Sequence, residues 1–164
     1  MQRREMVNNP FLAGLTPEQY DLLSPLFQPA NHAAGQAIFR QGDAATFMYL
    51  LTDGSVSILY KPYDGPQITL TSLHEGDVFG WSSVVGNPVY TSDALALNEV
   101  RTLRARGEDI RKTCLRHPTA GSQILQKLAL AVAPRWVDAQ AQVRKLLQEE
   151  ILDGGPTPST DALT

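Results

Sequence analysis

The chain has 164 residues, of which 43% are hydrophobic and 19% are charged. This length allows one domain with a sizeable core and is too short for two ordinary domains. The formal net charge is -3 and the fourteen Lys and Arg residues are scattered, so electrostatics does not indicate a nucleic-acid partner. A single Cys and an N-terminus without an apolar run do not indicate secretion or membrane spanning, and they favour a cytoplasmic protein.

The first predicted element is a short helix that begins after Thr16 and ends at about Leu23. Thr16 is a suitable N-cap, Pro17 fits the first helical position, and Gln19 stands three residues after the cap, as in a capping box.

From about residue 27 to 106 the pattern changes to short apolar or alternating runs separated by Gly, Asp, Asn and Pro. The runs are 37–39, 47–51, 56–60, 67–70, 94–97 and 100–103. Runs of this length and spacing predict strands, with Asp53-Gly54 and Asp64-Gly65 as the turns of two hairpins.

After Arg106 the pattern becomes helical again. Gly107-Glu108-Asp109 opens one helix, and a long helix is predicted from about 119 to 150, with a kink near Ala131 caused by Pro134. One apolar stripe along it contains Leu125, Leu128, Val132, Trp136, Ala139, Val143 and Leu146. A small β-domain cannot cover the whole stripe, so the sequence predicts a homodimer through this helix. Residues 153–164 are predicted to be a disordered tail.

These elements predict one domain over residues 1–152. Its fold class is mainly β with flanking helices: a β-sandwich or jelly roll (double-stranded β-helix) with a short N-terminal and a long C-terminal helix.

The residues between 35 and 80 carry a family resemblance. The segment 35–56, GQAIFRQGDAATFMYLLTDGSV, closely resembles the leading signature of the cyclic nucleotide-binding domain, the module of the catabolite activator protein and of the regulatory subunit of protein kinase A. The resemblance continues through 73–80, LHEGDVFG, includes the lead-in 9–15, and covers roughly residues 9–150. Most of the signature builds the fold: Gly42, Gly54 and Gly76 suit chain reversals, and 48–51 reads as a strand buried on both faces.

The resemblance implies a ligand site in the segment that follows, with cAMP or cGMP as ligand and no assigned cofactor. Its candidate residues are Phe79, Gly80, Trp81, Ser82, Ser83, Thr91 and Ser92. The family has a Glu for the ribose 2′-hydroxyl where this chain has Trp81, and an Arg for the cyclic phosphate ten residues later, at Thr91. An indole only donates and a Thr hydroxyl is uncharged, so two charged hydrogen bonds are lost, at a cost of about 3–6 kcal/mol.

Three roles remain open for this altered segment. Ser82 and Ser83 begin a short helical turn whose amides could bind an anion. Trp81 either offers a face to a flat ring or fills the space left by the carboxylate. Arg101 or Arg104, on a neighbouring strand, is the candidate for a replacement cation.

Other chemistry is not indicated. His32, His74 and His117 are far apart in the sequence and include no ligand pair, so no metal site is predicted. Cys114 lacks a recognisable His and acid partner set, and no catalytic residues or enzyme activity are predicted. In the regulator branch of the family a helix-turn-helix domain follows the long helix; here about a dozen residues follow, so we expect no direct nucleic-acid recognition.

Two function hypotheses follow. In the first, the chain is a stand-alone regulatory or sensor module that binds cAMP or cGMP weakly, or another small ligand, and passes the signal through the C-terminal dimer helix. In the second, it is a degenerate, ligand-free domain that acts in dimerisation or in binding a protein partner.

Overall fold

The computed structural model of the chain describes residues 9–132. Its strands are β1 (Gln28–His32), β2 (Ala37–Phe39), β3 (Phe47–Asp53), β4 (Val56–Tyr60), β5 (Ile68–Leu73), β6 (Val78–Phe79), β7 (Asp93–Ala96) and β8 (Val100–Arg106). Its helices are α2 (Pro10–Ala13), α3 (Pro17–Leu23), the 3-10 helix η1 (Ser24–Leu26), α4 (Ser82–Val85) and α5 (Gly107–Arg116). Residues 118–132 are also helical.

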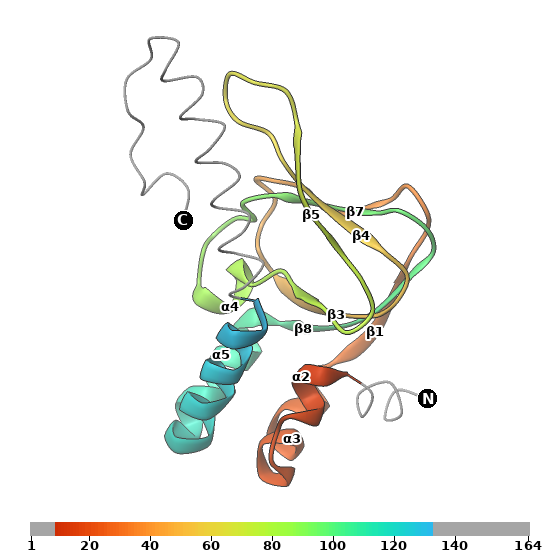
Figure 1. Cartoon of the computed structure of the whole chain (residues 1–164). Coiled ribbons are helices and arrows are strands. Elements are labelled where there is room, and N and C mark those ends of the chain that lie inside the picture. The colour runs from red at the N-terminus through yellow and green to blue at the C-terminus, as the bar shows by residue number, and fades with distance from the viewer. Residues whose placement is uncertain (1–8, 133–164) are drawn as a thin grey trace.

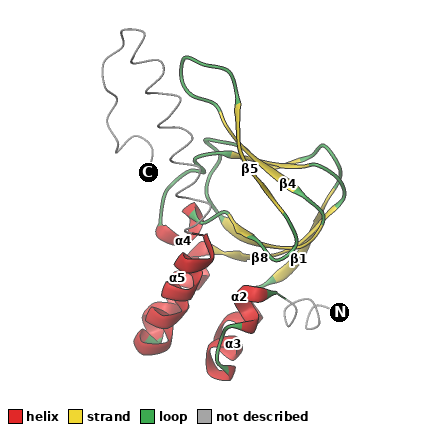
Figure 2. Cartoon of the chain, viewed as in Figure 1, coloured by secondary structure: helices red, strands yellow, loops and turns green. Residues whose placement is uncertain are grey.

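The strands form two four-stranded sheets, β1-β8-β3-β6 and β2-β7-β4-β5, in which all pairs are antiparallel. The two sheets face each other, and α2, α3, α5 and helix 118–132 lie on the outer side of the first sheet (Figure 1, Figure 2). The predicted mainly β sandwich with flanking helices is therefore confirmed.

Two apolar clusters lie on opposite faces of sheet β1-β8-β3-β6. The outer cluster joins this sheet to the helices and includes Met48 and Leu50 of β3 with Leu103 of β8. The inner cluster lies between the sheets and includes Tyr49 and Leu51 of β3. Alternate residues of a strand point to opposite faces, and residues 48–51 are all at most 3% exposed, so β3 is buried on both sides as predicted.

The predicted N-terminal helix is present with its cap. The Thr16 hydroxyl accepts from the Gln19 amide at 3.2 Å, and the Gln19 side chain accepts from the Thr16 amide at 3.1 Å. The Lys127 ammonium donates to Gly14 O at 2.9 Å and to Gln19 Oε1 at 2.7 Å. These bonds tie the N-terminal helices to helix 118–132.

One of the two predicted hairpins is wrong. Asp64-Gly65 lies between β4 and β5, which pair as expected, but Asp53-Gly54 joins β3 to β4, which belong to different sheets. An Asp-Gly pair indicates that the chain reverses its direction, but it does not indicate which sheet the next strand joins. Sequence reading also missed β1, which contains Pro29 at the sheet edge, and the two-residue β6.

The predicted long helix is described only in its first part. Leu128 and Val132 belong to the outer cluster, and Leu125 packs against it, so the start of the apolar stripe is covered by the chain itself. Pro134, the rest of the stripe, the dimer contact and the predicted tail lie outside the described residues.

The turn after β3 should tolerate no side chain. Gly54 has φ +98°, and a Cβ there would lie 2.5 Å from Glu99 O, whereas Gly35 has φ +82° and open space around it. We expect Gly54→Ala to lower the free energy of unfolding by more than about 2 kcal/mol, and Gly35→Ala by about 1 kcal/mol from backbone strain alone. Urea unfolding measures both variants, and equal losses would contradict the steric explanation.

Candidate ligand-binding site

The segment 79–92, called here the cassette, connects the inside of the sandwich to the helices. Phe79 and Tyr90, near its two ends, belong to the inner cluster. Gly80 leaves β6 with φ +80° so close to β3 that a Cβ would lie 2.6 Å from Phe47 O. The chain then forms α4 and turns at Gly86, which has φ +85°.

Two expected ligand residues of the cassette face the helices. Trp81 is half-buried and packs against the outer cluster, and it does not pack with the rings between the sheets. Whether Trp81 fills the space left by the family's carboxylate or offers a face to a flat ring stays a prediction; the contacts that the structure shows for it are with the outer cluster. Ser83 is 2% exposed and its hydroxyl donates to Gly80 O at 2.8 Å, so this hydroxyl stabilises the turn. Ser82, Thr91 and Ser92 are half-buried.

Helix α4 is fixed to α5. The Arg111 guanidinium donates from Nη1 to Ser83 O and, at 3.2 Å, to Val84 O, which lie at the C-terminal side of this short helix. Gly107 begins α5 so near to α4 that any Cβ there would collide with Ser83 O. Cations at a helix C-terminus are stabilising, and here the cation belongs to the neighbouring helix.

Aromatic rings occupy the space between the sheets next to the cassette. Phe39 stacks on Tyr90 with ring centroids 3.7 Å apart, and Tyr49 stacks on Phe79 at 5.0 Å. The Tyr90 hydroxyl donates to Phe47 O at 2.6 Å and accepts from Phe47 N at 2.9 Å. Burial raises the pKa of Tyr90 to about 12. Tyr90, which sequence analysis did not name, belongs to the inner cluster, and the half-buried Thr91 follows it; the role of Thr91 stays a prediction.

A cation lies beside the cassette, on β8. Val100 is in the inner cluster whereas Leu103 and Ala105 are in the outer one, so Arg104 shares the inner face with Val100. The Arg104 guanidinium lies 4.0 Å from the centroid of the Phe47 ring, and that of Arg106 lies 5.8 Å from it. We call these three residues the Phe47 corner.

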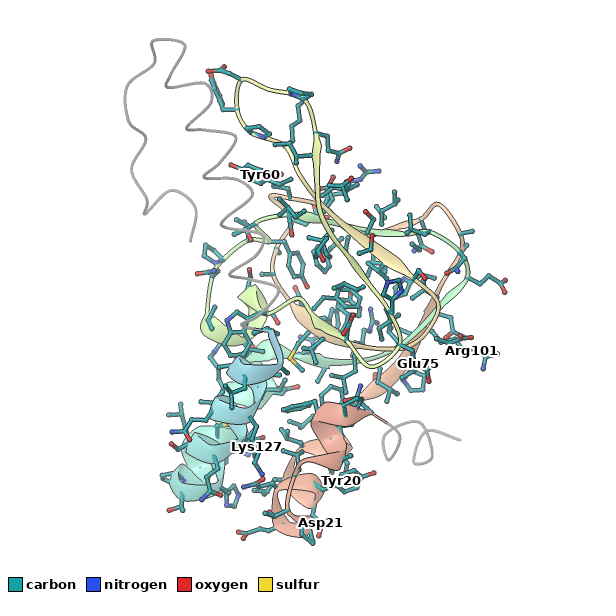
Figure 3. The ribbon with its side chains drawn as sticks, viewed as in Figure 1. Tyr20, Asp21, Tyr60, Glu75, Arg101 and Lys127 are labelled. Carbon is teal, nitrogen blue, oxygen red and sulfur yellow. The ribbon has the colours of Figure 1, made fainter. Side chains whose placement is uncertain are left out.

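The choice between the two arginines named from the sequence is therefore clear. Arg101 is exposed and on the other face of β8, and its side chain points away from the domain in Figure 3. Arg104 is half-buried and opposite Tyr49 in the β3-β8 register. Burial raises the pKa of Tyr49, and a hydrogen bond and the charge of Arg104 act in the opposite direction.

His32 is a second inward-facing polar residue, which sequence reading did not assign to the site. It is 9% exposed, its ring meets the Tyr49 ring edge-on at 5.9 Å, and its Nε2 lies 3.5 Å from the Thr102 hydroxyl. Its Nδ1 has no hydrogen-bond partner among the residues that the structure describes. Burial, and then the charge of Arg104, lower the pKa of His32. His32 is the last residue of β1, a short strand that also contains a proline. The sequence of this strand therefore shows no apolar alternation that would have indicated an inward-facing residue.

Within residues 9–132 no group of three or more His, Cys, Asp or Glu side chains is arranged to hold a metal ion. Over the same residues no helix has the length and apolar character needed to cross a bilayer. Cys114 is buried in the outer cluster, and burial raises the pKa of its thiol. A raised thiol pKa disfavours the reactive thiolate.

Comparison with known proteins agrees with this geometry. A family model described as the cyclic nucleotide-binding domain matches residues 30–117, more than half of the chain. The cyclic AMP receptor protein of Thermus thermophilus is 30% identical over 145 residues, which are 88% of this chain and 65% of that protein. A cAMP-activated global transcriptional regulator of Mycobacterium tuberculosis is 28% identical over 71% of this chain and 52% of its own length. The chain thus spans between about half and two thirds of these curated relatives.

Solved structures show the same fold. A proposed cyclic nucleotide-binding protein of Geobacter metallireducens superposes with a TM-score of 0.70 at 28% identity, over 82% of this chain and 96% of that one. The catabolite activator protein of Thermus thermophilus superposes with a TM-score of 0.68 at 29% identity, over 84% of this chain and 63% of that one. The chain belongs to the cyclic nucleotide-binding domain family.

The Tyr90 hydroxyl should matter for stability. Tyr90→Phe removes the partner of both the amide and the carbonyl of Phe47, so we expect the free energy of unfolding to fall by about 1–3 kcal/mol. Tyr63→Phe, at a side chain that is 100% exposed, is the matched control and should change it by less than about 0.5 kcal/mol. Urea unfolding measures both, and equal effects would show that the two hydrogen bonds contribute nothing.

His32 should make stability depend on pH. Because its pKa is lower in the folded chain than the unfolded value of about 6.5, the unfolded state binds more protons in the window between these values. This contribution to stability is complete above about pH 6.5 and is lost as the pH falls toward the lowered value. Urea midpoints should therefore fall less steeply with acidification in His32→Gln than in the wild type.

Proposed function

We propose that this chain is a regulatory module that senses a small ligand between its two sheets, either cAMP or cGMP at reduced affinity or another small anion. Membership in the cyclic nucleotide-binding domain family supports the type of ligand. The cassette has no charged residue, which supports the reduced affinity, because a charged hydrogen bond contributes about 1.5–3 kcal/mol.

The observation that carries the proposal is the position of the cassette. One side of it, through Phe79 and Tyr90, packs with the rings between the sheets, and the other side, through Trp81 and Val84, packs with the helices. Arg111 holds α4 to α5 by hydrogen bonds to two of its carbonyl oxygens. A ligand that moves α4 would therefore also move α5.

The signal would leave through the helix that starts at residue 118. Val84 of α4, Ile110 of α5 and Leu128 of this helix belong to one continuous apolar cluster. Close-packed side chains transmit displacement because the interior has little free volume. A homodimer formed by the later part of this helix completes the proposal, with a partner protein as the recipient of the signal.

A second candidate function is supported by the aromatic stack. Phe39, Tyr49, Phe79 and Tyr90 are each at most 7% exposed and pack against one another. If these rings keep the interior closed, the domain is an interaction or dimerisation module without a ligand. The rings, and not Trp81, would then fill the space.

Calorimetric titration with cAMP and cGMP separates the two candidates. We expect saturable binding of at least one of them with a dissociation constant between about 10 µM and about 1 mM, and no binding of the non-cyclic 5′-AMP. Hydrogen exchange of α5 should change on binding. No heat with either cyclic nucleotide up to millimolar concentration, and no change in exchange, would contradict cyclic nucleotide sensing, and an equally flat response to inorganic phosphate would favour the interaction module.

A matched pair of variants tests the route of the signal. Arg111→Gln should still bind ligand, but the exchange response of α5 should be reduced because the hydrogen bonds to α4 are weakened. Lys112→Gln is the control. It removes the neighbouring cation, which forms a surface ion pair with Glu108, and this variant should respond like the wild type. Equal responses of the two variants would exclude Arg111 as the coupling residue.

A further inference from the structure

Arg104 is a half-buried cation that has no counterion among residues 9–132. The ion pair between Lys112 and Glu108 lies on α5 and does not involve it. The neighbours of Arg104 are the Phe47 ring and Tyr49, and the second cation Arg106 also lies near the Phe47 ring. Removing a charge from water without an opposite charge costs free energy, and a bound anion would offset this cost.

This cation belongs to the same region as the cassette. Arg104 lies over the ring of Phe47, whose backbone carbonyl accepts a hydrogen bond from the Tyr90 hydroxyl and whose amide donates one to it. Gly80 approaches the same backbone from the other end of the cassette. An anion at the Phe47 corner would therefore lie next to the cassette, although the cassette itself supplies no charge.

His32 supplies a hydrogen-bond acceptor, whereas the Arg104 guanidinium supplies only donors. The Thr102 hydroxyl donates its one hydrogen to Ala30 O at 2.6 Å, so it can only accept from His32. The proton of a neutral His32 therefore resides on Nε2, which faces Thr102, and Nδ1 is an acceptor. This acceptor is buried without a donor, which a native structure rarely tolerates unless a ligand or water satisfies it.

We propose that Arg104 and His32 form a two-point site on the inner face of sheet β1-β8-β3-β6: Arg104 binds an anionic group of the ligand and His32 Nδ1 accepts from an N–H group. Tyr49, which contacts His32 and lies opposite Arg104, connects the two points. This inference rests on the proposed function, and it replaces the cassette by two strands, β8 and β1, as the source of ligand contacts.

The two points define a ligand class. The ligand is a small molecule with a phosphate or similar anion at one part and an amino group at another, with a flat ring that suits the aromatic surroundings. Neither point is a carboxylate, so a free sugar hydroxyl is not required. A purine cyclic nucleotide with an exocyclic amino group meets both requirements, and its 2′-deoxy form should bind equally well.

Two matched variants test the binding of an anion by Arg104, called here the anion point, by calorimetry with cAMP. Arg104→Gln should weaken binding at least tenfold, because it removes the cation that meets the phosphate. Arg101→Gln removes the same charge from the same strand on the exposed face and should change binding less than twofold (Figure 3). Equal effects of the two variants would overturn the assignment of Arg104.

The contact between His32 Nδ1 and the amino group of the ligand is called here the amino point. It is tested with a second ligand, the cyclic monophosphate of purine riboside, which lacks the amino group of cAMP. The wild type should prefer cAMP, His32→Phe should lose this preference, and His32→Asn should recover part of it because its amide oxygen can take the place of Nδ1. A preference that survives in His32→Phe would overturn the role of His32.

A third measurement does not depend on cyclic nucleotides. The pKa of His32, followed by NMR, should be higher in sodium sulfate than in sodium chloride at equal ionic strength, because sulfate at Arg104 neutralises the charge that lowers it. The difference should vanish in Arg104→Gln, and the exposed His74 and His117 serve as internal references.

The outcomes separate the inference from the proposed function. A sulfate effect without binding of cAMP or cGMP would overturn those ligands and support the anion point. Binding of a cyclic nucleotide without a sulfate effect and without a loss in Arg104→Gln would support the proposed function and overturn the two-point site.

Discussion

Strand β3 is buried on both faces, and the rest of the structure depends on this packing. Met48 and Leu50 hold the helices on one side, and Tyr49 and Leu51 hold the opposite sheet on the other. Burying a large apolar side chain contributes about 1.5–3 kcal/mol, so these positions anchor both clusters. The first residue of the strand, Phe47, then fixes the cassette through its backbone and Arg104 through its ring.

The site differs from a loop-based phosphate site in the rigidity of its parts. A cation on a short cassette can be ordered only when the cassette is ordered, whereas Arg104 stands on β8, which pairs with strands on both sides. Its guanidinium is held over an aromatic ring before any ligand arrives. Such preorganisation reduces the entropy lost on binding. Under the proposal, the cassette would have one task, to couple the interior to α5.

The fold could be predicted from the sequence in most of its elements, because strand length, turn residues and the capping box at Thr16 are local signals. The hairpin at Asp53-Gly54 was predicted wrongly because the pairing partner of a strand is a non-local property. The site was harder to predict from the sequence than the fold. The sequence placed Trp81 in the cassette, but the direction of its side chain depends on packing, and it packs against the outer cluster. Arg104 could be named from its strand, but the orphaned nitrogen of His32 depends on the hydrogen bond between Thr102 and Ala30.

The contact between Gly107 and Ser83 has a consequence for how sequences of this type can vary. No side chain fits at position 107 unless α4 and α5 separate. In this chain the close approach of α4 to α5 therefore requires glycine at position 107, and any larger residue there would have to push the two helices apart.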